Sequence, residues 1–121
     1  MINIFIVITI LFFHWVFDFV FQTDYEAKNK SKNNIALYSH TWKYSVLWFP
    51  VMLVFIGLKP SIEFVGITFL CHTITDYYTS RLNTKLHKEN RIHDFFVSIG
   101  FDQWLHYCQL FLTFYLIYGK L

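Results

Sequence analysis

Apolar residues form four long runs along the chain, separated by shorter polar stretches. Each run has about 20 residues, the length that an α-helix needs to cross a bilayer. The runs cover residues 2–22, 37–58, 61–80 and 94–118, and Gly100 leaves the start of the last one open between Asp94 and Asp102. The pattern predicts one all-α domain over residues 1–121, an integral membrane bundle of four transmembrane helices.

The composition supports this prediction. Of the 121 residues, 55% are hydrophobic and 22% aromatic, and only 15% are charged. A soluble domain of this size has too much surface to bury so many apolar side chains. The lipid bilayer is therefore a predicted partner, and the net charge of +2 is too small to suggest nucleic acid. Cys71 and Cys108 both lie in apolar runs, which argues against a disulfide framework.

Basic residues are distributed unevenly between the polar stretches. Seven lie in the stretches after the first and third runs, against only Lys59 and Lys120 on the opposite side. The positive-inside rule then predicts a multi-pass protein of the inner membrane, with both basic stretches in the cytoplasm and both termini outside it. The N-terminal run has no preceding basic residue and no small-residue cleavage site, so we expect it to be retained.

A His-x-x-x-Asp-aromatic motif occurs twice, as HWVFDF at residues 14–19 and HTITDY at residues 72–77. A spacing of four places the histidine and the aspartate on one helix face, and Gln22 extends the first such face. The recurrence is compatible with two parallel repeats of a helical hairpin, although the second and fourth runs do not match each other.

The other two runs carry similar residues at a similar depth. Asp102 and His106 are four residues apart in DQWLH, and His40 lies near the start of the second run. A buried aspartate in a bilayer costs about 2.5–3.5 kcal/mol, so the acidic residues need compensation. The only lysine or arginine within a run is Lys43, which leaves histidines and a bound cation. Simpler alternatives are Asp102 as a helix cap and His40 as an interfacial residue.

We therefore predict a shared site for a divalent transition metal, because imidazole and carboxylate ligands suit Zn²⁺, Mn²⁺ or Fe²⁺. The predicted metal ligands are His14, His40, His72, Asp102 and His106.

Further roles are predicted around this site. Asp18 and Asp76 are candidates for a general base or for a partner that orients a histidine. Gln22 and Gln103 are candidates for orienting a substrate or a water. In the basic stretches, the candidates for binding an anionic headgroup or phosphate are Lys28, Lys30, Lys32, Arg81 and Arg91, and Lys28 and Arg81 are the predicted substrate-binding residues.

Four segments carry a family resemblance: HWVFDFVFQTDYEAKNKSKN, YSHTWKYS, CHTITDYYTSR and FDQWLHY. In this order they resemble the signature of a small bacterial and phage integral membrane family that is catalogued as a domain of unknown function. The resemblance covers nearly the whole chain and implies no activity. The characteristic positions that it implies are His14, Asp18, Gln22, Lys28, His40, His72, Asp76, Asp102, Gln103 and His106.

Three functions are compatible with these residues. The first is a membrane-embedded, metal-dependent hydrolase acting on a small or lipid-linked anionic substrate at the cytoplasmic face. The second is a transporter of a metal ion, a proton-coupled solute or a small polar metabolite, for which four helices would require a homodimer. The third is a small regulatory membrane protein with a structural metal. The predicted outer half of the bundle has few polar residues, which favours the hydrolase over the transporter.

Overall fold

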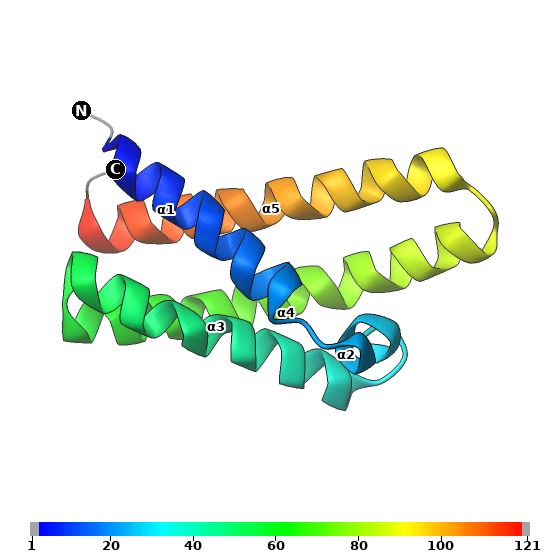
Figure 1. The fold of residues 1–121 in the computed structure, drawn as a ribbon, viewed down its shortest axis with the longest axis horizontal. Coiled ribbons are helices and arrows are strands. Elements are labelled where there is room, and N and C mark those ends of the chain that lie inside the picture. The colour runs from blue at the N-terminus through cyan, green and yellow to red at the C-terminus, as the bar shows by residue number, and fades with distance from the viewer. Residues whose placement is uncertain (1–2, 120–121) are drawn as a thin grey trace.

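The structure is a computed structural model that describes residues 3–119, and it is helical throughout apart from short connections (Figure 1). Three long helices, α3 (Asn34–Ile56), α4 (Leu58–Lys88) and α5 (Ile92–Tyr118), form an antiparallel, up-and-down arrangement. The N-terminal helix α1 (Ile4–Trp15) crosses the bundle obliquely and continues into a π-helix, η1 (Val16–Val20). A short helix, α2 (Asp24–Asn29), connects η1 to α3.

The helix ends follow from local sequence. The side chains of Asn3, Thr23 and Asn33 accept hydrogen bonds from backbone N–H groups in the first turns of α1, α2 and α3. Gly57 has a φ of +81°, which glycine adopts without strain, and it forms the tight turn between α3 and α4. Gly100 lies inside α5 and does not break it.

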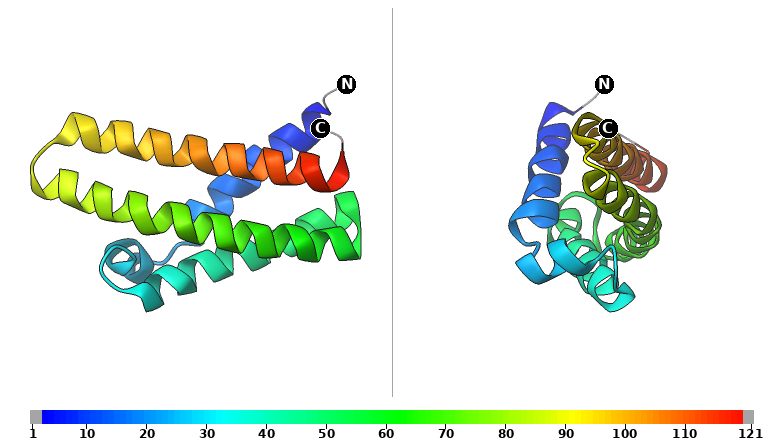
Figure 2. Two further views of the ribbon diagram at one scale, coloured as in Figure 1. Left: turned by 180° about the vertical axis from the view of Figure 1, so that it is seen from behind. Right: turned by 90° about the vertical axis from the view of Figure 1, so that its right-hand side faces the viewer.

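The helices pack around an interior with two parts. Towards the α3–α4 turn, apolar side chains form a core that includes Trp48, Phe64 and Phe114, all fully buried. Towards the other end the interior is polar, and histidines and aspartates from several helices are buried there. Figure 2 shows how α1 covers one side of the α3–α5 bundle, which closes this polar region.

The predicted membrane bundle is contradicted by these helices. Across residues 3–119, none of the helices combines enough length with enough apolar character to span a membrane. The helix α1 has only 12 residues before the π turn, and α4 extends through the polar stretch that was expected to be a linker. The inner-membrane location with both termini outside the cytoplasm, which depended on these spans, is likewise contradicted.

The error has a physical explanation in the distribution of side chains. The apolar runs are interrupted by polar residues that face the interior, such as His40, Thr41 and Ser45 in α3, all of them buried. Large apolar side chains occupy the outer faces instead, and Phe5, Val54 and Leu116 are each more than 75% exposed. The apolar composition therefore does not measure the size of an apolar core.

The two His-x-x-x-Asp motifs, which are compatible with a repeated hairpin, lie in different secondary structure. The first His-x-x-x-Asp motif lies where α1 changes into η1, whereas the second lies within a continuous helix of 31 residues. An extra short helix, α2, follows only the first motif.

Candidate metal centre

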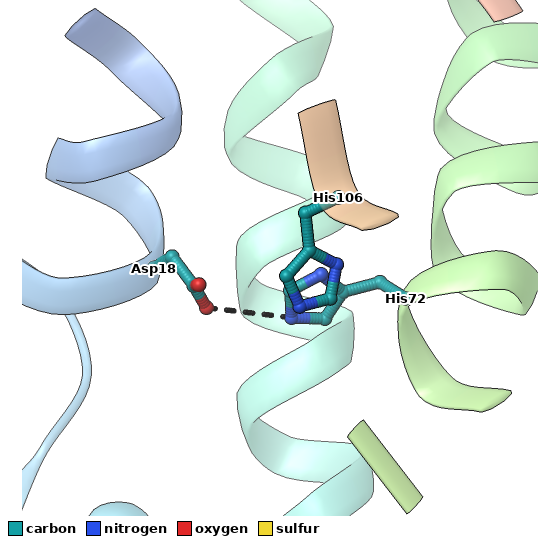
Figure 3. A group of neighbouring side chains, drawn as sticks. All are labelled: Asp18, His72 and His106. Carbon is teal, nitrogen blue, oxygen red and sulfur yellow. Dashed lines mark ion pairs between the residues drawn. The ribbon is translucent and has the colours of Figure 1, made fainter. Parts of the chain in front are cut away.

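Histidines and aspartates from four elements meet in the polar half of the interior. Asp18 comes from η1 and His40 from α3, while α4 supplies His72 and Asp76. The helix α5 adds Asp102 and His106, and each of these six residues is at most 9% exposed. Figure 3 shows three of them: the Asp18 carboxylate points to the edge of the His72 ring, on which the His106 ring is stacked at a centroid distance of 4.2 Å.

Four of these residues, His40, His72, Asp18 and Asp76, have donor atoms close to one another. The Nε2 atoms of His40 and His72 are 3.3 Å apart, and they lie 3.0 and 3.4 Å from Oδ1 of Asp18. The same two nitrogens are 3.5 and 3.8 Å from Oδ2 of Asp76. Ligand atoms bound to a tetrahedral zinc ion at its usual bond lengths are about 3.3 Å apart. These five distances, which involve the histidine nitrogens, are close to the spacing of donor atoms around a single metal ion.

A second group of donors adjoins the first and shares Asp76 with it. Nε2 of His106 is 3.1 Å from Oδ1 of Asp76 and 3.3 Å from Oδ1 of Asp102. Thr79 donates a hydrogen bond to the same Asp102 oxygen. Three groups of residues have potential ligand atoms within mutual reach of a metal ion: Asp18, His72 and His106; His40, His72 and Asp76; and Asp76, Asp102 and His106.

The position of Asp18 depends on the π-helix. The N–H of Phe21 donates to the carbonyl of Val16, five residues earlier, so this turn is wider than an α-helical turn. Single π turns inside helices occur frequently at functional sites. The helix ends directly afterwards, and Gln22 folds back to donate its amide to the Asp18 carbonyl. Gln22 therefore does not continue the helical face that its spacing predicted.

His14 is buried beside the cluster, but both of its ring nitrogens have protein partners. Nδ1 is 2.7 Å from the Tyr44 hydroxyl, and Nε2 is 2.7 Å from Oε1 of Gln103. The Gln103 amide in turn donates to Asp102 at 3.0 Å and to Asp18 at 3.4 Å. His14 thus orients Gln103, which bridges two of the aspartates, and it belongs to none of the three donor groups.

One of the lysines predicted to bind an anion, Lys30, contacts the cluster itself. Nζ of Lys30 is 2.7 Å from Oδ2 of Asp76. The residue follows α2, which is anchored by Glu26: its carboxylate accepts bonds from the Thr23 N–H, the Ser39 hydroxyl and Lys43. Thr23 and Glu26 form a capping box, a pattern that can be read in the sequence TDYE.

The ionisation of the cluster is set by these contacts. Burial alone would raise the pKa of Asp18, but hydrogen bonds from His40 and His72 hold that pKa well below its usual range. Burial opposes ionisation of Asp76 as well, and the charge of Lys30 outweighs it and lowers the pKa of Asp76. Both carboxylates are therefore charged in the folded chain.

The pKa values of His72 and His106 are shifted in opposite directions. Burial lowers the pKa of His72 to about 4, so its ring is neutral and its nitrogen lone pair is available to a metal. For His106 burial acts in the same direction, but hydrogen bonds to Asp102 and Asp76 raise its pKa to about 10. In the absence of a metal, His106 is thus a cation between two carboxylates.

Not all of the predicted site residues lie in the histidine–aspartate cluster. Four predicted ligands, His40, His72, Asp102 and His106, lie in the cluster. Lys28 lines a cavity next to it. Arg81 instead donates to Asn34 and to the carbonyl of Tyr77, away from that cavity.

Sequence reasoning missed three contributors, Glu26, Tyr44 and Thr79, and did not predict the contact of Lys30 with Asp76. Tyr44 stacks on His72 at a centroid distance of 4.0 Å. Its spacing of four from His40 and the capping box of Glu26 were available signals, whereas nothing in the sequence distinguishes Lys30 from its neighbouring lysines.

The fold and the site together define a helical bundle with a buried histidine–aspartate centre. The chain belongs to the family described as protein of unknown function (DUF3307), whose model matches residues 6–120. No curated protein and no solved structure matches the chain.

The family match assigns no activity. Because no described helix can span a membrane, the predicted membrane-embedded hydrolase and the alternative transporter are both contradicted. The buried cluster of histidines and aspartates, by contrast, is present and compatible with a bound metal.

Proposed function

We propose that this chain is a metal-binding protein and that its buried cluster holds one divalent transition metal ion, Zn²⁺, Mn²⁺ or Fe²⁺. The proposed ligands are His40, His72, Asp18 and Asp76. The observation that carries the proposal is the position of the two histidine nitrogens, which lie 3.3 Å from each other and 3.0–3.8 Å from one oxygen of each aspartate. This set revises the sequence-based assignment, since the two aspartates become ligands and His14 becomes a supporting residue.

Charge supports the same proposal. Three buried carboxylates, from Asp18, Asp76 and Asp102, face a single lysine, Lys30. When a bound metal takes over the role of the protonated His106, these carboxylates and Lys30 leave two negative charges to be balanced in a region of low dielectric constant. A divalent cation balances this charge, and mixed imidazole and carboxylate donors are the ligands that such ions accept.

The alternative is a metal-free ionic network with a purely structural role. A protonated His106 and Lys30 would then supply two positive charges against the three carboxylates. This arrangement also explains the short His106–Asp76 and Lys30–Asp76 distances. In this alternative, the approach of the Nε2 atoms of His40 and His72 is a hydrogen bond between the two rings.

Elemental analysis of protein purified without chelators tests the proposal. We expect one equivalent of metal per wild-type chain and its loss in His72→Ala and Asp18→Asn. His93→Ala is the matched control, because His93 is exposed and belongs to none of the donor groups. Circular dichroism confirms that each variant is folded. A folded wild-type chain that stays free of metal after incubation with Zn²⁺, Mn²⁺ or Fe²⁺ would establish the structural network instead.

A further inference from the structure

A cavity of about 460 Å³ lies between α2 with its following turn and the α4–α5 hairpin, which extends beyond α3 (Figure 1). Its volume falls within the range of small-molecule sites. The cavity adjoins the metal centre, because Lys30 lines it and also contacts Asp76. Its wall on α4 continues the polar face of the cluster: Ser80, Asn83, Thr84 and His87 follow His72 and Asp76 at helical spacing.

The charge around this cavity has one sign. Four lysines line it, Lys28, Lys30, Lys32 and Lys88, and no acidic residue does. Among the residues that the structure describes, Lys28, Lys32 and Lys88 form no ion pair, whereas Lys30 is engaged by Asp76. Three free ammonium groups around one cavity favour a ligand with a compact negative charge, such as a phosphate group.

Buried polar atoms indicate the rest of the ligand. Oγ of Ser80, Oε1 of Gln22 and Oδ1 of Asn83 are buried without a hydrogen-bond partner in the protein, and all three residues line the cavity. Ser80 as a whole is only 8% exposed. Unsatisfied buried polar groups are costly, and the two amide oxygens can only accept hydrogen bonds. A ligand with hydroxyl groups would satisfy them, and Phe95 and Ile99 supply an apolar wall for its carbon skeleton.

We propose that this cavity binds a small phosphorylated molecule that carries hydroxyl groups, of the chemical class of sugar phosphates. Lys28, Lys32 and Lys88 hold the phosphate, and Gln22, Ser80 and Asn83 bind the hydroxyl groups. The contacts that carry this assignment do not involve the metal, so the cavity binds its ligand whether or not the cluster is loaded.

Isothermal titration calorimetry with glucose 6-phosphate, glucose and inorganic phosphate as probes tests the proposal on the full chain. Glucose 6-phosphate should bind more tightly than phosphate, and glucose should bind least. Binding should weaken as the salt concentration rises, since the lysines are exposed to solvent. Equal affinity for phosphate and glucose 6-phosphate would overturn the assignment of the hydroxyl-binding residues.

Substitutions of single lysines test which residues hold the phosphate. Lys88→Ala and Lys28→Ala should each weaken glucose 6-phosphate binding about tenfold, as expected for one charge-assisted contact. Lys85→Ala is the control, because Lys85 is also exposed on α4 but does not line the cavity. An equal effect of Lys85→Ala and Lys88→Ala would overturn the proposal.

Ser80→Ala separates a ligand-binding role from a structural one. Because the Ser80 hydroxyl has no protein partner, the substitution should leave the melting temperature of the free chain unchanged or raise it. It should nevertheless weaken glucose 6-phosphate binding. A lower melting temperature with unchanged binding would contradict the assignment.

The same titrations are made on chelator-treated and Zn²⁺-loaded protein, with the metal content measured in parallel. Binding to both forms is the expected result. Failure of the chain to bind metal with retained sugar-phosphate binding would disprove the metal centre alone. Loss of sugar-phosphate binding in both forms with a stoichiometric metal would disprove the cavity assignment alone.

Discussion

Tyr44 has the most specific supporting role of any single residue at the centre. Its ring lies flat on the His72 ring with an interplanar angle of 15°, and its hydroxyl contacts Nδ1 of His14. The stacked ring restricts His72 to one orientation, and the hydroxyl restricts His14, which in turn holds Gln103. One side chain therefore fixes two histidines that approach from different helices.

Tyr44→Phe should destabilise the fold by about 1–2 kcal/mol, because it leaves a buried ring nitrogen of His14 without a partner. Denaturant titration followed by circular dichroism measures the change. Tyr38→Phe is the control, since Tyr38 lies on the same helix but is 52% exposed. The stacking on His72 is retained in Tyr44→Phe, so the metal content should stay near the wild-type value. Equal stabilities of Tyr44→Phe and wild type would show that the hydroxyl contact adds nothing.

At the scale of elements, the short helix α2 determines where the basic residues lie. Six residues are too few for a stable isolated helix, so α2 depends on its capping box and on its contacts with α3. Glu26 provides both, since its carboxylate closes the capping box and pairs with Lys43 and Ser39 of α3. This attachment places Lys28 and Lys30 beside α4.

Glu26 should give the fold a defined dependence on pH. Burial opposes its ionisation, but the hydrogen bond from Lys43 and those from Thr23 and Ser39 lower its pKa to about 2. A carboxyl group whose pKa is lower in the folded chain stabilises the fold above its unfolded pKa, and this contribution is lost as the pH falls towards 2. Between pH 5 and pH 2.5 we expect wild type to lose about 2 kcal/mol more stability than Glu26→Gln, with allowance for screening at the partly exposed Lys43.

Denaturant titrations across this pH range measure the difference. Glu63→Gln serves as the control, because Glu63 is exposed on α4 and has no ion pair among the residues described. Parallel losses of stability in wild type, Glu26→Gln and Glu63→Gln would mean that Glu26 does not anchor α2.

At the scale of the whole molecule, the proposed metal ties η1, which makes few contacts with α3, to the closely packed pair of α3 and α4. Its ligands come from η1, α3 and α4, and η1 belongs to the segment that crosses the bundle obliquely (Figure 2). A ligand that binds only the folded state stabilises it in proportion to the logarithm of its concentration. The metal should therefore stabilise the fold as a whole.

Chelation should lower the melting temperature, and added Zn²⁺ or Mn²⁺ should restore it. At a free metal concentration a hundred times the Kd, the linkage is worth about 2.7 kcal/mol, or about 10 °C for a chain of this length. Differential scanning calorimetry with and without chelator measures it, and Asp18→Asn should respond less because an amide is a poorer ligand. A melting temperature that is the same in both conditions would contradict a metal at this position.

The homodimer expected from the sequence remains a prediction. The outer faces of the helices expose large apolar side chains, including Phe12, Val54 and Leu116, and such surfaces are typical of protein association. Sedimentation equilibrium determines the mass in solution. A dimeric mass at micromolar concentration is the expected result, and a monomeric mass would exclude the dimer.

The sequence alone determined the helices and most members of the site. Long apolar runs separated by shorter polar stretches predict four helical segments, because helix formation depends on local residues. The two His-x-x-x-Asp pairs and the reversed pair of Asp102 and His106 identify helix faces that carry donor atoms. This periodicity is a property of each helix by itself, so it needs no knowledge of the fold.

Tertiary structure decided how the helices are arranged and what each polar residue does. The apolar runs predict membrane spans, and this prediction is wrong because composition does not say which face of a helix points inwards. In this fold the polar faces point inwards. The π turn at Asp18, the partners of His14 and the reach of Lys30 to Asp76 all depend on how separate elements pack. Whether a histidine is a ligand or a support is a matter of distances between helices, and these distances exist only once the chain has folded.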